Sequence, residues 1–329
     1  MVSLEVVQQS NKLLGSLPQC EGLVAVFVGA TSGIGLSALE HLARSATAPR
    51  IYSAARAQTA AAHKAFLETL HNETDKAGQG TKTGAFTMID ADASLVQDMD
   101  RLATAVAQRE AKVDLIVLSA GFFAFEGRID TVEGLDPSMS TRYYARIRLV
   151  ERLLPLLDAA PHARVVWVLA AGEESPLNED DLDLRQPENW SLWNASRHAC
   201  TMSTLALERI ARDHPRLSIT HWFPGPVQTP GLERSNANGL NPPNPRTQDE
   251  AGQRVVFLAT SDRYALNPGW VPVPAGLQRL PPAAGGIFMV GADGELKDNQ
   301  AVLGPMREKG LDERVWAFTQ AMFEEIGRH

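Results

Sequence analysis

Short apolar runs rich in β-branched residues alternate along the chain with longer stretches whose apolar positions recur at helical spacing. The short runs predict strands at 23–28, 50–54, 84–89, 114–119, 164–169, 218–222 and 286–290. The longer stretches predict helices at 33–46, 57–73, 94–109, 137–157, 190–212, 247–260 and about 310–326. Since helices usually connect parallel strands, this alternation predicts an α/β fold, a Rossmann-like doubly wound parallel sheet of about seven strands in three layers.

Two segments depart from the alternation. Residues 1–16 have the pattern of an amphipathic helix, so we expect residues 1–20 to form a leader in front of the first strand. Residues 236–283 are rich in Pro and Gly on both sides of one short helix. Because a strand-like run follows them, we expect an insertion at about 230–283 within a single domain that spans residues 1–329.

The composition narrows the class of protein. The chain has 329 residues, 44% of them hydrophobic, and a net charge of −8 without a block of like charge, which disfavours nucleic acid and anionic membranes as partners. Its longest apolar runs have the length of strands, and its first 20 residues lack the features of a signal peptide. The two cysteines, Cys20 and Cys200, fit no metal-binding spacing. We therefore expect a cytoplasmic protein without a metal site.

A glycine-rich loop follows the first strand. The segment "LVAVFVGATSGIG" places Gly29, Gly33 and Gly35 between a buried strand and a helix. Gly29 allows a tight turn, Gly33 lets the backbone approach a pyrophosphate, and Gly35 permits close packing of helix against strand. The N-terminus of the helix then stabilises the phosphate charge. This order of elements predicts a dinucleotide-binding loop.

Three further motifs follow in order: "DAS" from Asp92, "LSAG" from Leu118, and "PGPVQT" from Pro224. With the glycine loop they resemble the short-chain dehydrogenase/reductase family over nearly the whole chain. The residues of these motifs are most similar to those of fungal members of the family, many of which are from secondary metabolism. The resemblance implies cofactor contacts at the three glycines and at Thr31, Ser32, Ile34, Asp92, Ser119, Ala120, Gly121, Pro224, Gly225, Val227 and Thr229.

The end of the second strand bears on the choice between NAD and NADP. An acidic residue there would bind the ribose 2′-hydroxyl, whereas a basic residue accommodates a 2′-phosphate. The segment "RIYSAARAQ" has no acid and places Arg56 just beyond the strand. A guanidinium suits phosphate recognition, so we predict NADP(H) as cofactor. A solvated surface arginine is the alternative.

The catalytic pair of the family is absent. Family members carry a Tyr and a Lys four residues apart on the helix after the fifth strand, where they share one helix face. None of the four tyrosines here has a lysine four residues later. Alignment by the end of that helix puts Trp190 and Asn194 at the two positions, and neither side chain is a proton donor near neutral pH. The family's serine position falls at Ala170 or Ala171, and its asparagine position falls near Arg142.

Other side chains are candidates for the reaction centre. Tyr143 adjoins Arg142 on a helix expected to face the site, although a core aromatic beside a surface arginine is the plainer interpretation. His198 lies four residues after Asn194 and could titrate near neutrality, or it could be structural. Glu173 follows the fifth strand at the edge where α/β sheets bind ligands, unless it is simply a solvated loop acid.

Three functions agree with these observations. The first is an NADP(H)-dependent oxidoreductase with an unusual proton path, acting on a carbonyl or imine of a bulky, apolar natural-product intermediate. The second is a non-redox isomerase, dehydratase or cyclase on the same scaffold. The third is a non-catalytic NADP-binding regulator.

The resemblance also implies a substrate lid in the insertion, where Trp270 is a candidate contact and disorder is the alternative. It implies pairing of two copies through the helices at 137–157 and 190–212. The first of these helices carries four arginines, so the sequence does not decide whether a homodimer forms: Arg142, Arg146, Arg148 and Arg152.

Overall fold

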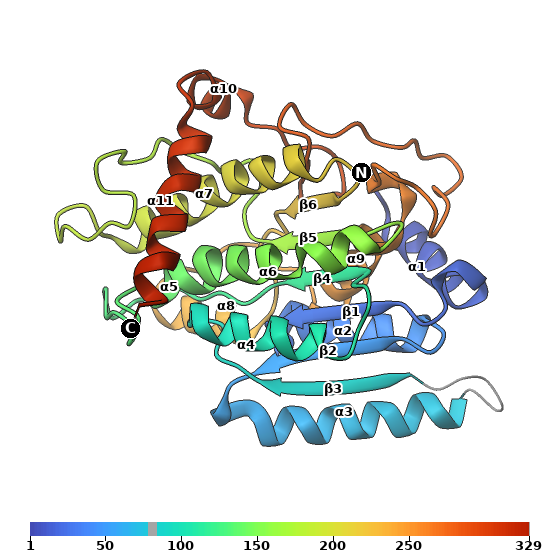
Figure 1. Cartoon of the computed structure of the whole chain (residues 1–329). Helices are drawn as coiled ribbons and strands as arrows, with labels where there is room; N and C mark the ends of the chain where they lie inside the picture. The colour runs from blue at the N-terminus through green and yellow to red at the C-terminus, as the bar shows by residue number, and fades with distance from the viewer. Residues whose placement is uncertain (78–83, 329) are drawn as a thin grey trace.

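The computed structural model describes residues 1–77 and 84–328. Within these residues seven strands form one parallel sheet in the order β3-β2-β1-β4-β5-β6-β7 (Figure 1). The strands are β1 Val24–Val28, β2 Arg50–Ala55, β3 Ala85–Asp90, β4 Leu115–Leu118, β5 Arg164–Val168, β6 Ser218–Trp222 and β7 Phe288–Val290. The strand order reverses direction between β1 and β4, so the predicted doubly wound α/β fold is confirmed.

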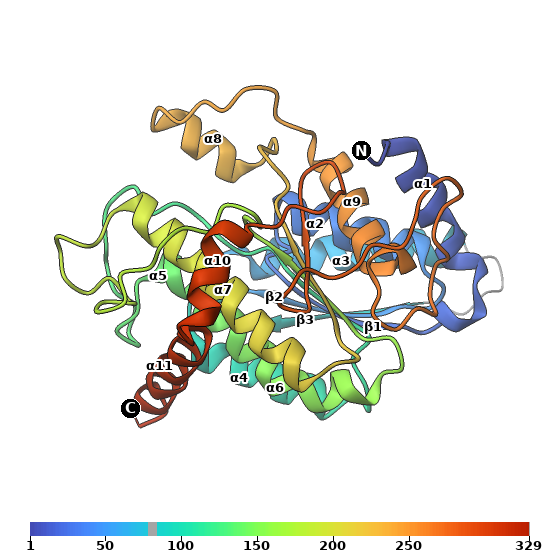
Figure 2. The same ribbon diagram turned by 90° about the horizontal axis from the view of Figure 1, so that it is seen from above.

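Helices cover both faces of the sheet, as Figure 2 shows from above. One layer contains α1 Leu4–Leu13, α2 Gly33–Ser45, α3 Ala57–Ala77 and α9 Gln248–Thr260. The other contains α4 Val96–Ala107, α6 Ala145–Ala159 and α7 Leu192–Asp213. Two hydrophobic clusters correspond to these layers, one on each side of the sheet, because alternate strand residues point to opposite faces. None of the described helices has the length and apolar character needed to cross a bilayer.

The leader and the short helix of the insertion belong to the scaffold. Asn11 of α1 donates from Nδ2 to the carbonyl oxygen of Gln253 in α9 at 2.9 Å. Helix α9 in turn packs closely on α2, because Gly252 has no side chain: a Cβ there would lie 2.2 Å from Ser37 Oγ. The leader therefore covers the α2–α9 layer.

The predicted helix at 137–157 is interrupted near its start. A short α5, Pro137–Met139, leads into a π-helical turn over Ser140–Tyr144, and α6 then continues to Ala159. Asp136 caps the start, since its Oδ1 accepts from Met139 N at 2.8 Å. All five residues of the π turn are buried. π turns often occur at functional sites, and this one carries Arg142.

The helix expected at 190–212 starts two residues later than predicted. Ser191 is its N-cap and accepts from Asn194 N at 3.1 Å, so α7 begins at Leu192. Trp190 therefore precedes the helix. Trp190 and Asn194 do not share a helix face, and that expectation was wrong.

Two C-terminal helices, α10 Gln300–Glu308 and α11 Leu311–Ile326, close the fold (Figure 2). Arg212 of α7 pairs with Glu313 at 2.8 Å, and the guanidinium of Arg148 in α6 lies 5.2 Å over the Phe323 ring. Helix α11 thus covers part of the α6 and α7 surface through which the resemblance implies pairing.

The insertion divides into two parts. Helix α8, Pro230–Ala237, and the residues before α9 lie at the carboxyl edge of the sheet (Figure 2). After α9 the chain passes to the amino edge, where Ser261 forms a bridge with Val271. Trp270 is buried there beneath the guanidinium of Arg164, the first residue of β5, at 5.1 Å. Trp270 is therefore not a substrate contact, and a lid could comprise only the first part of the insertion.

Candidate active site

A cavity of about 460 Å³ lies at the carboxyl ends of β1, β2, β3 and β4, where the strand order reverses. Its size is in the range typical of small-molecule sites. Twelve of the predicted cofactor residues line it: Gly29, Thr31, Ser32, Gly33, Ile34, Gly35, Arg56, Asp92, Ser119, Ala120, Gly121 and Thr229. The glycine loop, the ends of β2 and β3, and the "LSAG" segment therefore share one hollow.

The glycines of the loop stand where a side chain would collide with neighbouring atoms. A Cβ on Gly29, whose φ is +95°, would lie 2.2 Å from Ala120 N. A Cβ on Gly35 would lie 2.3 Å from Ser119 Oγ, which itself donates to the Gly29 carbonyl at 3.2 Å. Backbone N–H groups and the N-terminus of α2 thus face the cavity without obstruction. This arrangement fits a pyrophosphate.

Arg56 and Asp92 line the cavity at the ends of β2 and β3. Arg56 is exposed on the cavity wall directly after β2, next to Ala55. Asp92 follows β3, and its Oδ1 accepts from Ser94 N at 2.9 Å and from Ser94 Oγ at 2.8 Å. This turn fixes the Asp92 carboxylate at the wall.

The Pro-Gly segment approaches the cavity from β6. Thr229 lines the wall and caps α8, accepting at Oγ1 from Leu232 N at 3.1 Å. Pro224, Gly225 and Val227 lie behind the wall rather than on it. Arg246 holds them there, since its Nη1 donates to the Pro224 carbonyl at 2.9 Å and its backbone bridges to Val227.

Arg234 of α8 also lines the cavity, with its guanidinium 6.0 Å from the Phe122 ring. This exposed cation was not among the residues predicted from the sequence. An arginine shortly after the Pro-Gly segment could have identified it.

The position expected for the family's serine offers no hydroxyl. Ala170 N–H donates to His221 Nε2 at 3.3 Å, and its carbonyl accepts from Cys200 Sγ at 3.0 Å. Burial lowers the pKa of His221 to about 3, so the imidazole is neutral. Burial also raises the pKa of Glu174, which accepts from Thr204 Oγ1 at 2.8 Å. The end of β5 thus rests on a buried polar cluster that supports the backbone.

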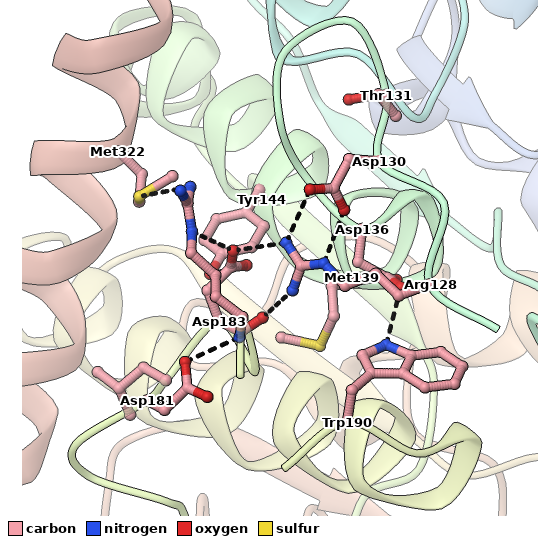
Figure 3. A network of polar contacts seen from close by, with 12 residues as sticks. Arg128, Asp130, Thr131, Asp136, Met139, Tyr144, Asp181, Asp183, Trp190 and Met322 are labelled. Atoms are coloured by element: carbon pink, nitrogen blue, oxygen red, sulfur yellow. Dashed lines mark hydrogen bonds and ion pairs between the residues drawn. The ribbon is translucent and has the colours of Figure 1, made fainter. Parts of the chain in front are cut away.

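Trp190 supports the start of α5. Figure 3 shows it beside Asp136, to whose Oδ2 its Nε1 donates at 2.9 Å. The adjoining network joins Arg128 to Asp183 at 3.1 Å and Tyr144 Oη to Asp183 at 3.0 Å. Asn194 is exposed and donates to the Asn189 carbonyl at 2.9 Å. Neither of the residues aligned with the missing pair presents an acid to the cavity.

Tyr143 and His198 are also tied into the protein interior. Tyr143 Oη lies 2.6 Å from Thr319 Oγ1 of α11, and burial raises the pKa of its phenol. His198 Nδ1 donates to the Leu182 carbonyl at 3.2 Å, while Nε2 accepts from Asn178 N at 3.1 Å. Burial lowers the pKa of His198. Its imidazole and Asn194 line a second cavity of about 390 Å³, separate from the first.

Glu173 lies at the carboxyl edge of β5, as expected, but it is paired with Lys297 Nζ. Lys297 follows β7, and its Nζ is 4.4 Å from the Phe223 ring centroid. Its stem passes against Gly172, where a Cβ would lie 2.4 Å from Lys297 Cγ. The sequence analysis missed this cation, because only the strand order brings residue 297 beside residue 173.

Arg142 lies beside the cofactor cavity. A Cβ on the wall residue Gly121 would be 3.3 Å from Arg142 Cγ, and the Arg142 guanidinium carbon is 4.7 Å from the Phe123 ring centroid. The side chain is only 5% exposed, and burial lowers its pKa to about 10. Arg142 therefore remains charged at neutral pH.

Comparison with known proteins identifies the class. The family model "short chain dehydrogenase" matches residues 23–239. The chain therefore belongs to the short-chain dehydrogenase family of oxidoreductases, as the motifs predicted.

Similar proteins occur in fungi. The NmrA-like family domain-containing oxidoreductase notO of Aspergillus sp. is 55% identical over 100% of this chain and 97% of its own length. Oxidoreductase AN1596 of Emericella nidulans is 35% identical over 99% of both chains. The predicted resemblance to fungal members is confirmed.

Solved structures share the fold. A protein from Mycobacterium paratuberculosis superposes with a TM-score of 0.57 at 18% identity, covering 94% of this chain and 96% of its own. A metagenomic short-chain oxidoreductase in complex with NADP gives a TM-score of 0.52 at 19% identity, covering 78% of this chain and 97% of its own.

Proposed function

We propose that the chain is an NADP(H)-dependent oxidoreductase that acts on a carbonyl or imine of a bulky natural-product intermediate. The observation that carries this proposal is the assembly of the glycine loop, Arg56, Asp92 and the "LSAG" segment around one cavity at the reversal of strand order. The nicotinamide, when bound, would supply or accept the hydride. The residues of the chain bind it, orient it and exclude water.

Arg56 supports NADP(H) over NAD(H). The last residues of β2 on the cavity wall are Ala54 and Ala55, so no carboxylate is placed there to bind a ribose 2′-hydroxyl. A guanidinium at this rim can donate several charge-assisted hydrogen bonds to a 2′-phosphate. The NADP complex of the metagenomic relative agrees with this choice.

Aromatic side chains support a bulky, apolar substrate. Phe123 and Trp193 meet edge to face with ring centroids 5.7 Å apart, and Phe125 lies 6.0 Å from Phe123. Trp193 is 49% exposed although it is a large apolar side chain. Trp193 packs on Phe123, the chain neighbour of the cavity-wall residue Phe122, and so offers an apolar surface to a ligand.

The test is turnover with the purified chain on a panel of aromatic ketones and cyclic imines, followed both by nicotinamide absorbance and by product analysis. Reduction of a panel member with equal consumption of NADPH supports the proposal. We expect NADH to be used much less well, since it lacks the 2′-phosphate. If NADPH binds but no panel member is reduced, the oxidoreductase proposal fails for these substrate classes.

Non-redox catalysis is the second candidate. The observation that favours it is the reaction centre: in the parts of the chain that the structure describes, no tyrosine–lysine pair lies beside the cavity. Its mark would be product formation with no change in nicotinamide absorbance. Tight nucleotide binding without turnover of any compound would instead indicate a regulatory role.

A further inference from the structure

Arg142 is a buried cation that no carboxylate bonds directly. Its side chain is 5% exposed, and within residues 1–77 and 84–328 no hydrogen bond or ion pair joins its guanidinium to another residue. The guanidinium carbon lies 4.7 Å from the centroid of the Phe123 ring. Burial of a charge is unfavourable unless the charge is paired, so the site is complete only with a further group.

A second buried arginine adds to the positive charge. Arg146, 2% exposed, donates to four backbone carbonyls among the described residues: Nε to Thr141 at 3.1 Å, Nη1 to Leu118 at 3.1 Å and to Val168 at 3.0 Å, and Nη2 to Ala120. These bonds tie the ends of β4 and β5 together without neutralising the guanidinium. Arg146 therefore has a structural role, and its charge increases the demand for an anion near Arg142.

The carboxylate whose charge acts on Arg142 is already hydrogen-bonded to other groups. Asp136 raises the pKa of Arg142 through its charge, but no bond joins the two. The Asp136 oxygens accept from Met139 N at 2.8 Å, Ser138 Oγ at 2.6 Å and Trp190 Nε1 at 2.9 Å. The Asp136 charge therefore acts on Arg142 without a direct bond, while the neighbouring Arg146 adds a second positive charge.

The unpaired guanidinium adjoins two surfaces that a ligand can reach. On one side is Gly121 of the cavity wall, where a Cβ would lie 3.6 Å from Arg142 Nε. On the other side Phe123 carries Arg142 over its ring and meets the exposed Trp193. One molecule can place an anionic oxygen at Arg142 and a flat apolar group against Phe123 and Trp193.

We propose that Arg142 binds a negatively charged oxygen of the substrate, a carboxylate or an acidic enol, and that the substrate's planar aromatic portion packs on Phe123 and Trp193. This inference rests on the proposed function, because it places the substrate beside a bound nicotinamide. It assigns an aromatic, anionic substrate class and excludes a cationic group at this position.

The test uses the full chain loaded with NADP and two probes of equal shape, 2-naphthoate and 2-naphthylmethylammonium, with binding measured by calorimetry. The variants are Arg142→Gln, which removes the charge, and Arg142→Lys, which keeps it. Arg152→Gln is the matched control, a half-exposed arginine of α6 that pairs with Asp100 at 3.2 Å away from the cavity. Titration of NADPH into every variant accompanies the probe titrations.

We expect naphthoate to bind and the ammonium not to bind. Arg142→Gln should weaken naphthoate by at least about tenfold, the loss of one charged hydrogen-bond donor. Arg142→Lys should lie between Arg142→Gln and the wild type, and the affinity for NADPH should stay within about twofold throughout.

Four results overturn the inference. Equal binding of the two probes to the wild type overturns the inference. This result needs no variant, so it holds even if Arg142→Gln does not fold. Unchanged naphthoate affinity in a folded Arg142→Gln overturns the inference too. A parallel loss of NADPH affinity in Arg142→Gln would assign Arg142 to the cofactor and leave the proposed function standing. Failure of the wild type to bind NADPH would instead remove the proposed function and this inference with it.

Discussion

The two halves of the carboxyl edge differ in how their residues are placed. On the β1–β4 side, residues from four sequence motifs line one cavity. On the β5–β6 side, the predicted residues are dispersed: Trp190 bonds Asp136, Tyr143 reaches Thr319, and Glu173 pairs with Lys297. The first half gathers the residues of the proposed cofactor site around one cavity. In the second half the predicted residues bond to other parts of the protein, so the proposed cofactor site and the proposed reaction centre can be tested separately.

The largest effect is expected from closing the cofactor half. Gly29→Ala would force a Cβ to within 2.2 Å of Ala120 N at a φ of +95°. We expect NADPH binding to be abolished and the free energy of unfolding to fall by about 3 kcal/mol or more. Calorimetry and denaturant unfolding measure the two effects.

Gly276→Ala is the matched control for that substitution. Gly276 has a φ of +81° but no atom within 4 Å of its Cβ position. We expect a loss of only about 1–2 kcal/mol, the strain of a left-handed conformation, with normal NADPH binding. Equal NADPH affinity in the two variants would show that the glycine loop does not hold the cofactor.

Trp190→Phe examines the residue at the lost tyrosine position. It removes the donor to Asp136 Oδ2 and leaves a buried carboxylate with one partner fewer. We expect the free energy of unfolding to fall by about 2 kcal/mol, with turnover retained in the fraction that remains folded. A large loss of turnover at unchanged stability would contradict the structural role and place Trp190 against the substrate.

His221→Gln examines the polar cluster beneath β5. The pKa of His221 is lowered by burial from 6.5 to about 3, so between these values the unfolded chain binds a proton that the folded chain does not. The free energy of unfolding of the wild type is therefore highest above pH 6.5 and falls as the pH decreases below that value. The wild type should lose about 2 kcal/mol more than the variant between about pH 7.5 and about pH 5. Parallel unfolding curves of the two proteins would contradict a buried neutral imidazole.

Tyr143→Phe should have the smallest effect. Loss of the bond to Thr319 is expected to lower the free energy of unfolding by about 1 kcal/mol and to leave turnover unchanged. Tyr264→Phe is the control, since Tyr264 is equally buried and donates to the Gly294 carbonyl at 2.7 Å. If Tyr143→Phe alone abolished turnover, Tyr143 would be the missing proton donor.

The sequence predicted most of what depends on local backbone. The strand positions and the glycine loop follow from apolar runs and from positions that tolerate no Cβ. Arg56 was predictable because a strand end fixes its place on the edge of the sheet. Trp190 was misplaced because the helix was counted from its end, although Ser191 directly before Leu192 and Trp193 is a recognisable N-cap signal.

Other features could not be predicted because they depend on contacts distant in sequence. Lys297 reaches Glu173 only through the order of β5, β6 and β7. Tyr143 faces away from the cavity because α11 supplies Thr319. Arg142 has no direct bond to Asp136 because the Asp136 oxygens accept from other groups. Helical spacing in the sequence does not indicate which groups donate to Asp136.

The affinity of the purified chain for NADPH and for NADH, with Arg56→Ala measured alongside, decides whether the cavity is an NADP(H) site. Fluorescence of the reduced nicotinamide and calorimetry report the dissociation constants. We expect NADPH to bind much more tightly than NADH, and Arg56→Ala to weaken the affinity for NADPH by about 10–100-fold while leaving the affinity for NADH unchanged. No binding of either nucleotide, or a preference that survives Arg56→Ala, would contradict this expectation.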